Sequence, residues 1–201
     1  MTLRIANGAG FLGDWLDAPR QIVTRTEVDY LTLEYLAELT MSILARQREK
    51  DPTAGFAEDF LTVLASIAEP LQQQPRLKIV TNAGGMNPTA CAIAAGELLA
   101  ANGMEQTQIG VVTGDDLLPR LDDLVAAGCE FRHLDTNEPL GGLRSRVVSA
   151  NAYLGASPIV DALAGGSRIV ITGRVADASL TVGPAVHEFG WQWNQWPQLA
   201  G

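Results

Sequence analysis

Short apolar runs alternate along the chain with longer amphipathic segments, a pattern typical of strands that are connected by helices. Strands are predicted at 3–7, 76–82, 108–114, 129–135, 146–155 and 167–174. Helices are predicted at 33–48, 56–72, 88–103, 115–128, 157–166 and 177–190, and another begins at Asp17-Ala18-Pro19. The segment VDYLTLEY, which overlaps the first of these helices, is ambiguous because it starts like a strand. Helices between successive strands imply parallel pairing through right-handed crossovers. The sequence therefore predicts an α/β fold: an open, mostly parallel sheet with helices on both faces, a Rossmann-like three-layer sandwich.

Several predicted helices carry capping signals at their ends. Asn87 precedes Pro88 as an N-cap, and Ser157 precedes Pro158 in the same way. At the other end, Asn102-Gly103 and Gly165 are typical of glycine exits. The chain shows no repeat and no linker, so residues 1–201 are predicted to form a single α/β domain.

The charge and composition exclude several classes of protein. A formal charge of −9 leaves no basic face for nucleic acid. No apolar stretch approaches the roughly 20 residues of a membrane span, and no signal peptide is visible, so we expect a cytoplasmic protein. Cys91 and Cys129 lack metal-type spacing and are interpreted as free thiols. Two histidines, His133 and His187, supply a zinc site or a Ser-His-Asp triad poorly, and we predict no metal or prosthetic group.

Three tryptophans, Trp191, Trp193 and Trp196, lie close together near the end of the chain. So much indole surface usually has a partner. Either this segment folds back on the domain, or the chain is the N-terminal part of a longer protein. We favour the second interpretation.

The candidate chemistry lies in the loops after the predicted strands, because open parallel sheets bind ligands beyond the carboxyl ends of their strands. Five loops combine glycine with small polar residues: NGAGFLGD, TNAGGMNP, TGDD, SANAYLGA and TGRVADAS. Glycine lets the backbone approach a ligand closely, and amides at a helix N-terminus suit an anion. These loops are therefore candidate walls of one binding site.

TNAGGMNP and TGRVADAS are the most informative of these loops. Gly84 and Gly85 can form a nest for a phosphate, carboxylate or thioester oxygen, or a tight turn that simply needs glycine. Arg174 offers a fork of donors for a carboxylate or phosphate. Asp177 can act in proton transfer or serve only as an N-cap.

TGDD and SANAYLGA give weaker signals. Asp115 and Asp116 stand at a predicted helix start, where the helix dipole favours acids, and we interpret them as caps. Asn151 and Tyr153 can orient a carbonyl group, although a loop Asn or Tyr is structural at least as often as it is functional.

The string Gly8-Ala9-Gly10-Phe11-Leu12-Gly13 matches the G-x-G-x-x-G fingerprint of dinucleotide-binding loops, and Glu34 lies where a ribose-binding acid is expected. However, Pro19 would break a helix begun at Gly10. We therefore prefer to interpret the string as one wall of a shared strand-end site that includes Asn7 and Asp14.

Five blocks of the chain together resemble the N-terminal half of the acyclic terpene utilisation family, the AtuA-type proteins. They are IANGAGFLGD, DYLTLEYLAELTM, TNAGGMNP, SANAYLGA and ITGRVADASLTVGP, in collinear order. The resemblance covers essentially the whole chain, and family members are considerably longer. It implies a cytoplasmic role in the breakdown of acyclic terpenes such as citronellol and geraniol through CoA thioesters. It implies no settled reaction and no established catalytic residue.

We predict an enzyme, or the larger part of one, that acts on an acyl-CoA or related carboxylate in terpenoid or branched-chain acid degradation. The catalytic candidates are Arg174, which would hold an anionic or carbonyl oxygen, and Asp177 and Glu34, which would transfer protons. The candidate substrate-binding residues are Asn7, Gly8, Gly10, Asp14, Asn82, Gly84, Gly85, Asn87, Asn151, Tyr153 and Gly173.

Two other classes stay open. One is an NAD(P)-dependent oxidoreductase that uses the Gly8–Gly13 loop and Glu34. The other is a non-catalytic ligand-binding or assembly partner. We expect no nucleic acid or membrane partner, and a homo-oligomer stays open as well.

Overall fold

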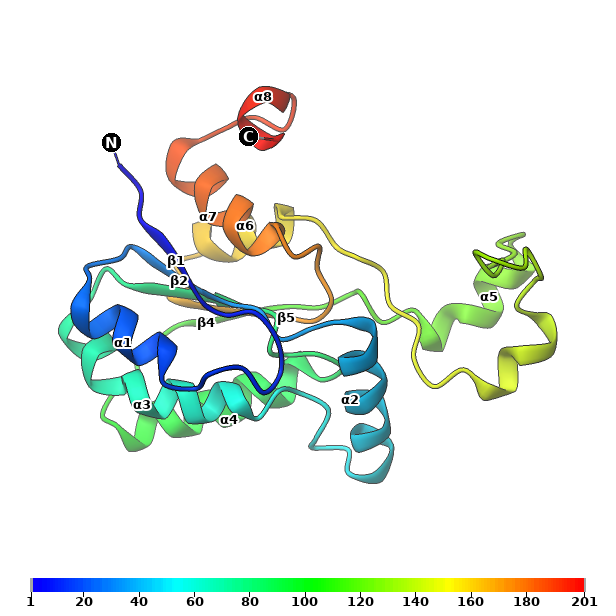
Figure 1. Cartoon of the computed structure of the whole chain (residues 1–201), viewed down its shortest axis with the longest axis horizontal. Helices are drawn as coiled ribbons and strands as arrows, with labels where there is room; N and C mark the ends of the chain where they lie inside the picture. The colour runs from blue at the N-terminus through cyan, green and yellow to red at the C-terminus, as the bar shows by residue number, and fades with distance from the viewer. Residues whose placement is uncertain (1, 201) are drawn as a thin grey trace.

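The computed structural model describes residues 2–200 and contains a five-stranded sheet with helices around it (Figure 1). The strands are β1 (Ile5–Ala9), β2 (Tyr30–Leu33), β3 (Lys78–Thr81), β4 (Ile109–Val112) and β5 (Ile169–Thr172). They are ordered β1-β2-β3-β5-β4, and each neighbouring pair is parallel. The predicted α/β fold is confirmed.

Helices cover both faces of this sheet (Figure 1). On one face lie α1 (Ala18–Arg25), α3 (Asp59–Gln73) and α4 (Pro88–Ala101), and on the other lie α6 (Ser157–Ala164) and α7 (Ser179–Phe189). The long helix α2 (Glu38–Lys50) stands near the carboxyl ends of the strands, and α8 (Trp196–Ala200) follows α7. The remaining elements are η1 (Leu118–Arg120), α5 (Leu121–Ala126) and η2 (Gly141–Arg146).

The central strands β2, β3 and β5 are buried on both faces, which explains why they are mostly apolar. Leu31 and Ile79 pack in the core under α1, α3 and α4, together with Phe60 of α3. On the opposite face, Val80 and Val170 belong to the core beneath α6 and α7. Alternate side chains of one strand thus enter two different cores.

Helix-end signals locate most of the helices correctly. Asn87 caps α4, and its side chain accepts a hydrogen bond from the amide of Ala90. Gly103 has φ +71, as expected for a glycine exit. The prediction for Ser157 is wrong by one residue, because Ala156 is the N-cap and Ser157 is the first residue of α6.

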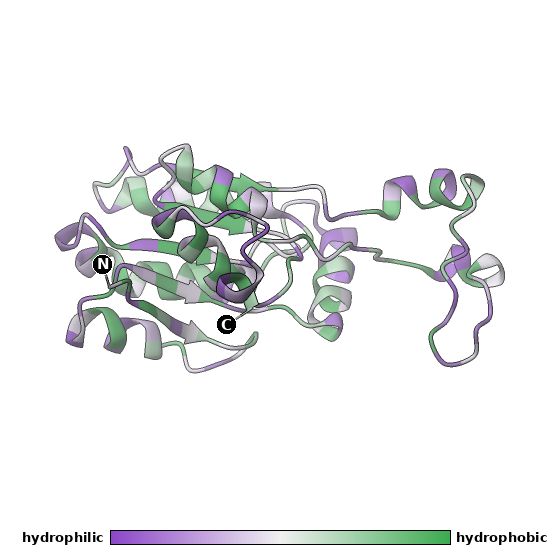
Figure 2. Ribbon diagram, turned by 90° about the horizontal axis from the view of Figure 1, so that it is seen from above, coloured by the Kyte–Doolittle hydropathy of each residue, from purple (hydrophilic) through white to green (hydrophobic). Residues whose placement is uncertain are grey.

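The largest difference from the sequence prediction falls between β4 and β5. Residues 117–150, which we call the arm, project away from the sheet and return to it (Figures 1 and 2). The strands predicted at 129–135 and 146–155 are wrong: within the described residues, pairing there is limited to isolated bridges at Asn151 and Leu154. The helix predicted at 115–128 is reduced to η1 and α5. Apolar alternation does not make a strand where no neighbouring strand is available to pair with it.

The structure also bears on membrane association. No helix within residues 2–200 combines the length and the apolar character needed to cross a lipid bilayer.

Candidate functional site

The carboxyl ends of β3 and β5 form a topological switch point, because the chain leaves these adjacent strands on opposite faces of the sheet; we call this region the crevice. After β3 it continues into α4, and after β5 into α7, which lies on the other face (Figure 1). Open α/β sheets bind ligands at such a switch point. The two most informative loops, TNAGGMNP and TGRVADAS, both begin here.

The two loops approach each other closely at Gly84. A Cβ atom on Gly84 would lie 2.5 Å from the carbonyl oxygen of Thr172 and 2.8 Å from Cα of Pro88. Both neighbours are backbone atoms, so they cannot move aside as a flexible side chain would. Glycine at this position is therefore required by the close approach of the β3 and β5 loops.

Arg174, which follows β5, is the central cation of the crevice and is only 5% exposed. One guanidinium nitrogen, Nη1, donates to the carbonyl oxygen of Leu36 at 3.0 Å and to Oδ1 of Asp177 at 2.9 Å. The ring of Tyr153 covers the guanidinium, with 4.1 Å between Cζ and the ring centroid. Burial and stacking hold the fork in one orientation.

Two exposed carboxylates partly neutralise this guanidinium. Glu38 lies 4.0 Å from Nη2 of Arg174, and its side chain is 83% exposed. It also accepts a hydrogen bond from the Tyr153 hydroxyl, the main cause that lowers the pKa of Glu38. The second carboxylate is that of Asp177. Both acids are solvated enough to be displaced from Arg174 by a competing anion.

Glu34 follows β2 and is the partly buried acid of the same region. Its Oε1 accepts hydrogen bonds from the side-chain amide of Asn82 and, at 2.8 Å, from the amide of Leu36. Its other oxygen, Oε2, is buried and has no hydrogen-bond partner within the described residues. Burial is the main cause that raises the pKa of Glu34, and Asp177 adds to the rise.

Asp115 positions the backbone of Arg174 through a hydrogen bond, a role that the sequence did not indicate. Its Oδ2 accepts hydrogen bonds from the amide of Arg174 at 2.8 Å and from the side chain of Asn151 at 2.9 Å. A Cβ atom on Gly173 would lie 2.5 Å from Oδ1 of Asp115, so this contact explains the glycine. Burial raises the pKa of Asp115. The interpretation of Asp115 as a helix cap is wrong, whereas Asp116 accepts from the amide of Leu118 as a cap does.

The predicted backbone nest at 84–88 is largely occupied by the protein itself. The amides of Gly85, Met86 and Asn87 donate to the carbonyl oxygens of Asn82, Gly55 and Gly84. The amide of Ala83 donates to the Thr81 hydroxyl. Within residues 83–87 of the described structure, the Gly84 amide is the one without an assigned acceptor.

The Gly8–Gly13 string lacks the geometry of a dinucleotide loop. Gly8 lies within β1, and α1 begins only at Ala18, so no helix N-terminus stands at Gly10. Asp14 instead closes the loop by accepting from the amides of Gly10 and Trp15 at 2.8 and 2.7 Å, which lowers its pKa. The string still borders the crevice, because the carbonyl of Ala9 accepts from the Glu34 amide.

The predicted site residues therefore divide into two groups. Those joined around the crevice by the contacts above are Glu34, Asn82, Gly84, Asn151, Tyr153, Gly173, Arg174 and Asp177. Asn87 is committed elsewhere, since its side chain donates to the carbonyls of Pro52 and Ala54. Asn7 contacts Thr32 on β2, and Gly85 packs against Leu44 of α2.

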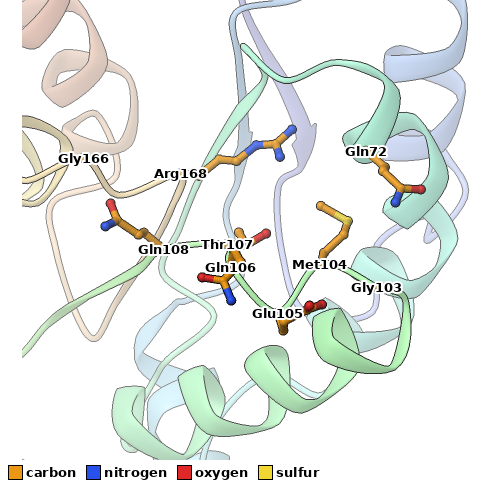
Figure 3. Close-up of a pocket in the computed structure, with 9 residues that line it drawn as sticks. All are labelled: Gln72, Gly103, Met104, Glu105, Gln106, Thr107, Gln108, Gly166 and Arg168. Atoms are coloured by element: carbon orange, nitrogen blue, oxygen red, sulfur yellow. The ribbon is translucent and has the colours of Figure 1, made fainter.

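A separate cavity of about 410 Å³ lies at the opposite, amino end of the strands (Figure 3). Gln72, Met104, Gln108 and Arg168 are among its lining residues. Arg168 donates to the carbonyls of Leu71, Gln74 and Leu77, so its guanidinium already holds the end of α3. Its role there is structural.

A comparison with known families shows which family the chain belongs to. The family model described as acyclic terpene utilisation family protein AtuA matches residues 3–201. The chain belongs to this family. No curated protein and no solved structure gives a significant match to the chain. Of the resemblance predicted from the five sequence blocks, membership of the AtuA family is confirmed.

Proposed function

We propose that this AtuA family chain forms the acid-binding and proton-transfer site of an enzyme acting on an acyl-CoA or related carboxylate derived from acyclic terpenoids or branched-chain acids. The observation that carries the proposal is the buried Arg174 beside Glu34, a partly buried acid with a raised pKa and an unpartnered oxygen. To activate a carbonyl compound, an enzyme needs at least a fixed cation that polarises the carbonyl oxygen and an acid whose pKa allows it to transfer a proton.

Arg174 would bind a carboxylate or thioester oxygen of the substrate. That oxygen would replace the protein carboxylates that now contact the guanidinium. Glu38 and Asp177 now occupy its donors, and both are solvent-exposed. Replacing an exposed carboxylate by a substrate oxygen costs little, because the outgoing carboxylate regains its hydration. The Gly84 amide is the second candidate donor for the same oxygen.

Glu34 would give or take the proton. Because its pKa is raised, a larger protonated fraction persists toward neutral pH than for an ordinary glutamate. Asn82 and the Leu36 amide fix one oxygen, which leaves Oε2 to act on the substrate. Asp115 acts through Arg174 and Asn151, so it is a positioning residue.

A binding titration with geranoyl-CoA, followed by tryptophan fluorescence, tests the proposal. We expect saturable binding by the wild-type chain and a loss of roughly 10- to 100-fold in affinity for Arg174→Ala, the equivalent of one charged hydrogen bond. Glu38→Gln should change affinity in the opposite direction, because it removes a competing carboxylate without disturbing the core. Arg20→Ala, at an exposed position of α1, is the matched control.

Several outcomes would contradict this assignment. If Arg174→Ala remained folded by circular dichroism and bound geranoyl-CoA as well as the wild type, Arg174 would not hold the substrate. Binding without any turnover that depends on Glu34 would favour the non-catalytic alternative. Saturation by NADH that requires Gly10 would favour the oxidoreductase alternative.

A further inference from the structure

The guanidinium of Arg174 has one edge that is not committed to the protein. Within residues 2–200 both of its hydrogen bonds use Nη1, which donates to the Leu36 carbonyl and to Asp177. The other terminal nitrogen, Nη2, lies 4.0 Å from the Glu38 carboxylate, which is beyond hydrogen-bond distance. A ligand oxygen can therefore accept a hydrogen bond from Nη2 while the contacts of Nη1 stay in place.

The Nη2 edge is also reachable from outside the protein. Among the described residues, the fully buried side-chain atoms that lack a hydrogen-bond partner are limited to Glu34 Oε2 and the Tyr35 hydroxyl. Because Nη2 lacks a partner and is not one of these atoms, it retains contact with solvent. The ring of Tyr153 covers a face of the guanidinium, so a ligand would approach along the edge.

The charges around this edge are predominantly negative. The side chains of Glu38 and Asp177 are 83% and 66% exposed, and exposed carboxyl groups are ionised at neutral pH. Glu34 is a third carboxyl group of the crevice. Burial is the main cause that raises its pKa, Asp177 adds to the rise and Arg174 opposes it, so the three groups affect one another's charge. One cation therefore faces two ionised carboxylates and a third acid that titrates.

An anionic ligand and a neutral ligand meet different forces at this edge. A carboxylate that accepts from Nη2 brings its charge close to Glu38 and Asp177, and like charges a few ångströms apart repel each other. If one of the protein carboxylates moves away, the exchange gains little, because one carboxylate only replaces another beside the same cation. A neutral carbonyl oxygen accepts the same hydrogen bond without either cost.

We propose that Glu38 and Asp177 make the crevice select a neutral carbonyl group, such as that of a thioester, over a free carboxylate. The inference rests on the proposed function, because it assumes that the crevice binds an acyl compound, and it narrows the ligand to the thioester form. In the selected complex Nη2 of Arg174 holds the carbonyl oxygen. Glu38 then acts as a specificity-determining residue, because its charge excludes the free acid.

Three ligands that share one carbon chain test the selection: geranic acid, geranamide and geranylamine. At neutral pH they are anionic, neutral and cationic, and the acid and the amide have nearly the same size. Isothermal titration calorimetry of the full chain measures their affinities. We expect geranamide to bind about tenfold more tightly than geranic acid, because only the acid is repelled.

Each other outcome of this titration has a separate meaning. Equal affinities for the acid and the amide, or a higher affinity for the acid, would overturn the selection and leave the proposed function standing. Tighter binding of geranylamine than of geranamide would overturn it too, since the acids would then bind the ligand in place of Arg174. If neither these ligands nor geranoyl-CoA bind, the proposed function fails and the selection fails with it.

Variants that remove one carboxylate show which residues select. Glu38→Gln leaves an exposed side chain that can still accept from the Tyr153 hydroxyl, so the fold should be preserved. The preference for geranamide over geranic acid should fall by about 3- to 10-fold in Glu38→Gln, and Asp177→Asn should lower it in the same direction.

Glu105→Gln is the matched control, because it removes an exposed carboxylate at the amino end of the strands, beside the cavity of Figure 3. It should leave the preference unchanged. A preference that persists in the double variant Glu38→Gln with Asp177→Asn would show that these acids do not select the ligand. An equal fall in Glu105→Gln would show that the net charge of the chain selects it instead.

Discussion

The sheet and the arm contain similar apolar patterns but use them in opposite ways. RLKIVTN becomes β3, which pairs with β2 on one side and β5 on the other, and its residue Ile79 is fully buried. CEFRHLD, which also alternates apolar and polar residues, lies in the arm with Leu134 fully exposed. The difference teaches that an apolar run acquires its structure from the neighbours that cover it, within the chain or outside it.

Truncating one apolar side chain in each region should give the largest contrast. Ile79→Ala removes a side chain packed in the core and is expected to lower the free energy of unfolding by about 2–5 kcal/mol. Leu134→Ala should change it by less than about 0.5 kcal/mol, because the side chain is exposed in the single chain. Urea denaturation of the two variants measures both changes. Equal losses would contradict the distinction between the regions.

Adding one methyl group to a glycine in each region should give an intermediate contrast. Gly84→Ala forces a Cβ against the Thr172 carbonyl and Pro88, and we expect a loss of about 1–3 kcal/mol. Gly142→Ala meets nothing within 4 Å, so it should be neutral or stabilise the chain by at most about 1 kcal/mol. Thermal unfolding of the two variants provides the comparison. A well-tolerated Gly84→Ala would mean that the β3 and β5 loops are not in close contact.

The smallest expected contrast is in how an acidic side chain of each region makes the free energy of unfolding depend on pH. Burial raises the folded-state pKa of Glu34 above its ordinary value of 4.5, so the fold favours the protonated form. As pH rises from about 4.5 toward this raised pKa, the unfolded chain ionises first and the wild type loses stability relative to Glu34→Gln. Above the raised pKa the difference should stay constant.

Urea denaturation across that pH range measures this difference. Asp123→Asn serves as the control for the loss of one carboxylate, because Asp123 is an exposed acid of the arm. Parallel profiles for wild type and Glu34→Gln would show that burial does not perturb Glu34.

The parts of the fold that local signals determine could be predicted from the sequence. Residues 79–81 and 169–172 are all β-branched, and Asn87 with Pro88 marks the start of α4. Glycine residues between these elements indicated where the chain turns. These signals were sufficient for the parallel α/β fold, because each acts within a few residues.

Interactions between distant segments could not be predicted in the same way. Asp115 follows β4 in a sequence that resembles a helix cap, but its carboxylate binds the amide of Arg174, 59 positions away. Glu38 was missed as well, because its relation to Tyr153 and Arg174 exists only after α2 is placed beside β5. The sequence indicated loops whose residues come together at the carboxyl ends of the strands, and tertiary packing determined which of their side chains contact one another.

The hydrogen bond between Asp115 and Asn151 joins the two ends of the arm across 36 positions. The connection between these ends can therefore vary in length at small cost, since doubling a flexible loop adds only about 0.6 kcal/mol of closure entropy. A proteolytic cut after Leu134 would separate the chain into two fragments that remain associated, because β5 of the second fragment lies between β3 and β4 of the first. The α/β body would therefore hold together as two separate chains, because residues on either side of the arm share one sheet.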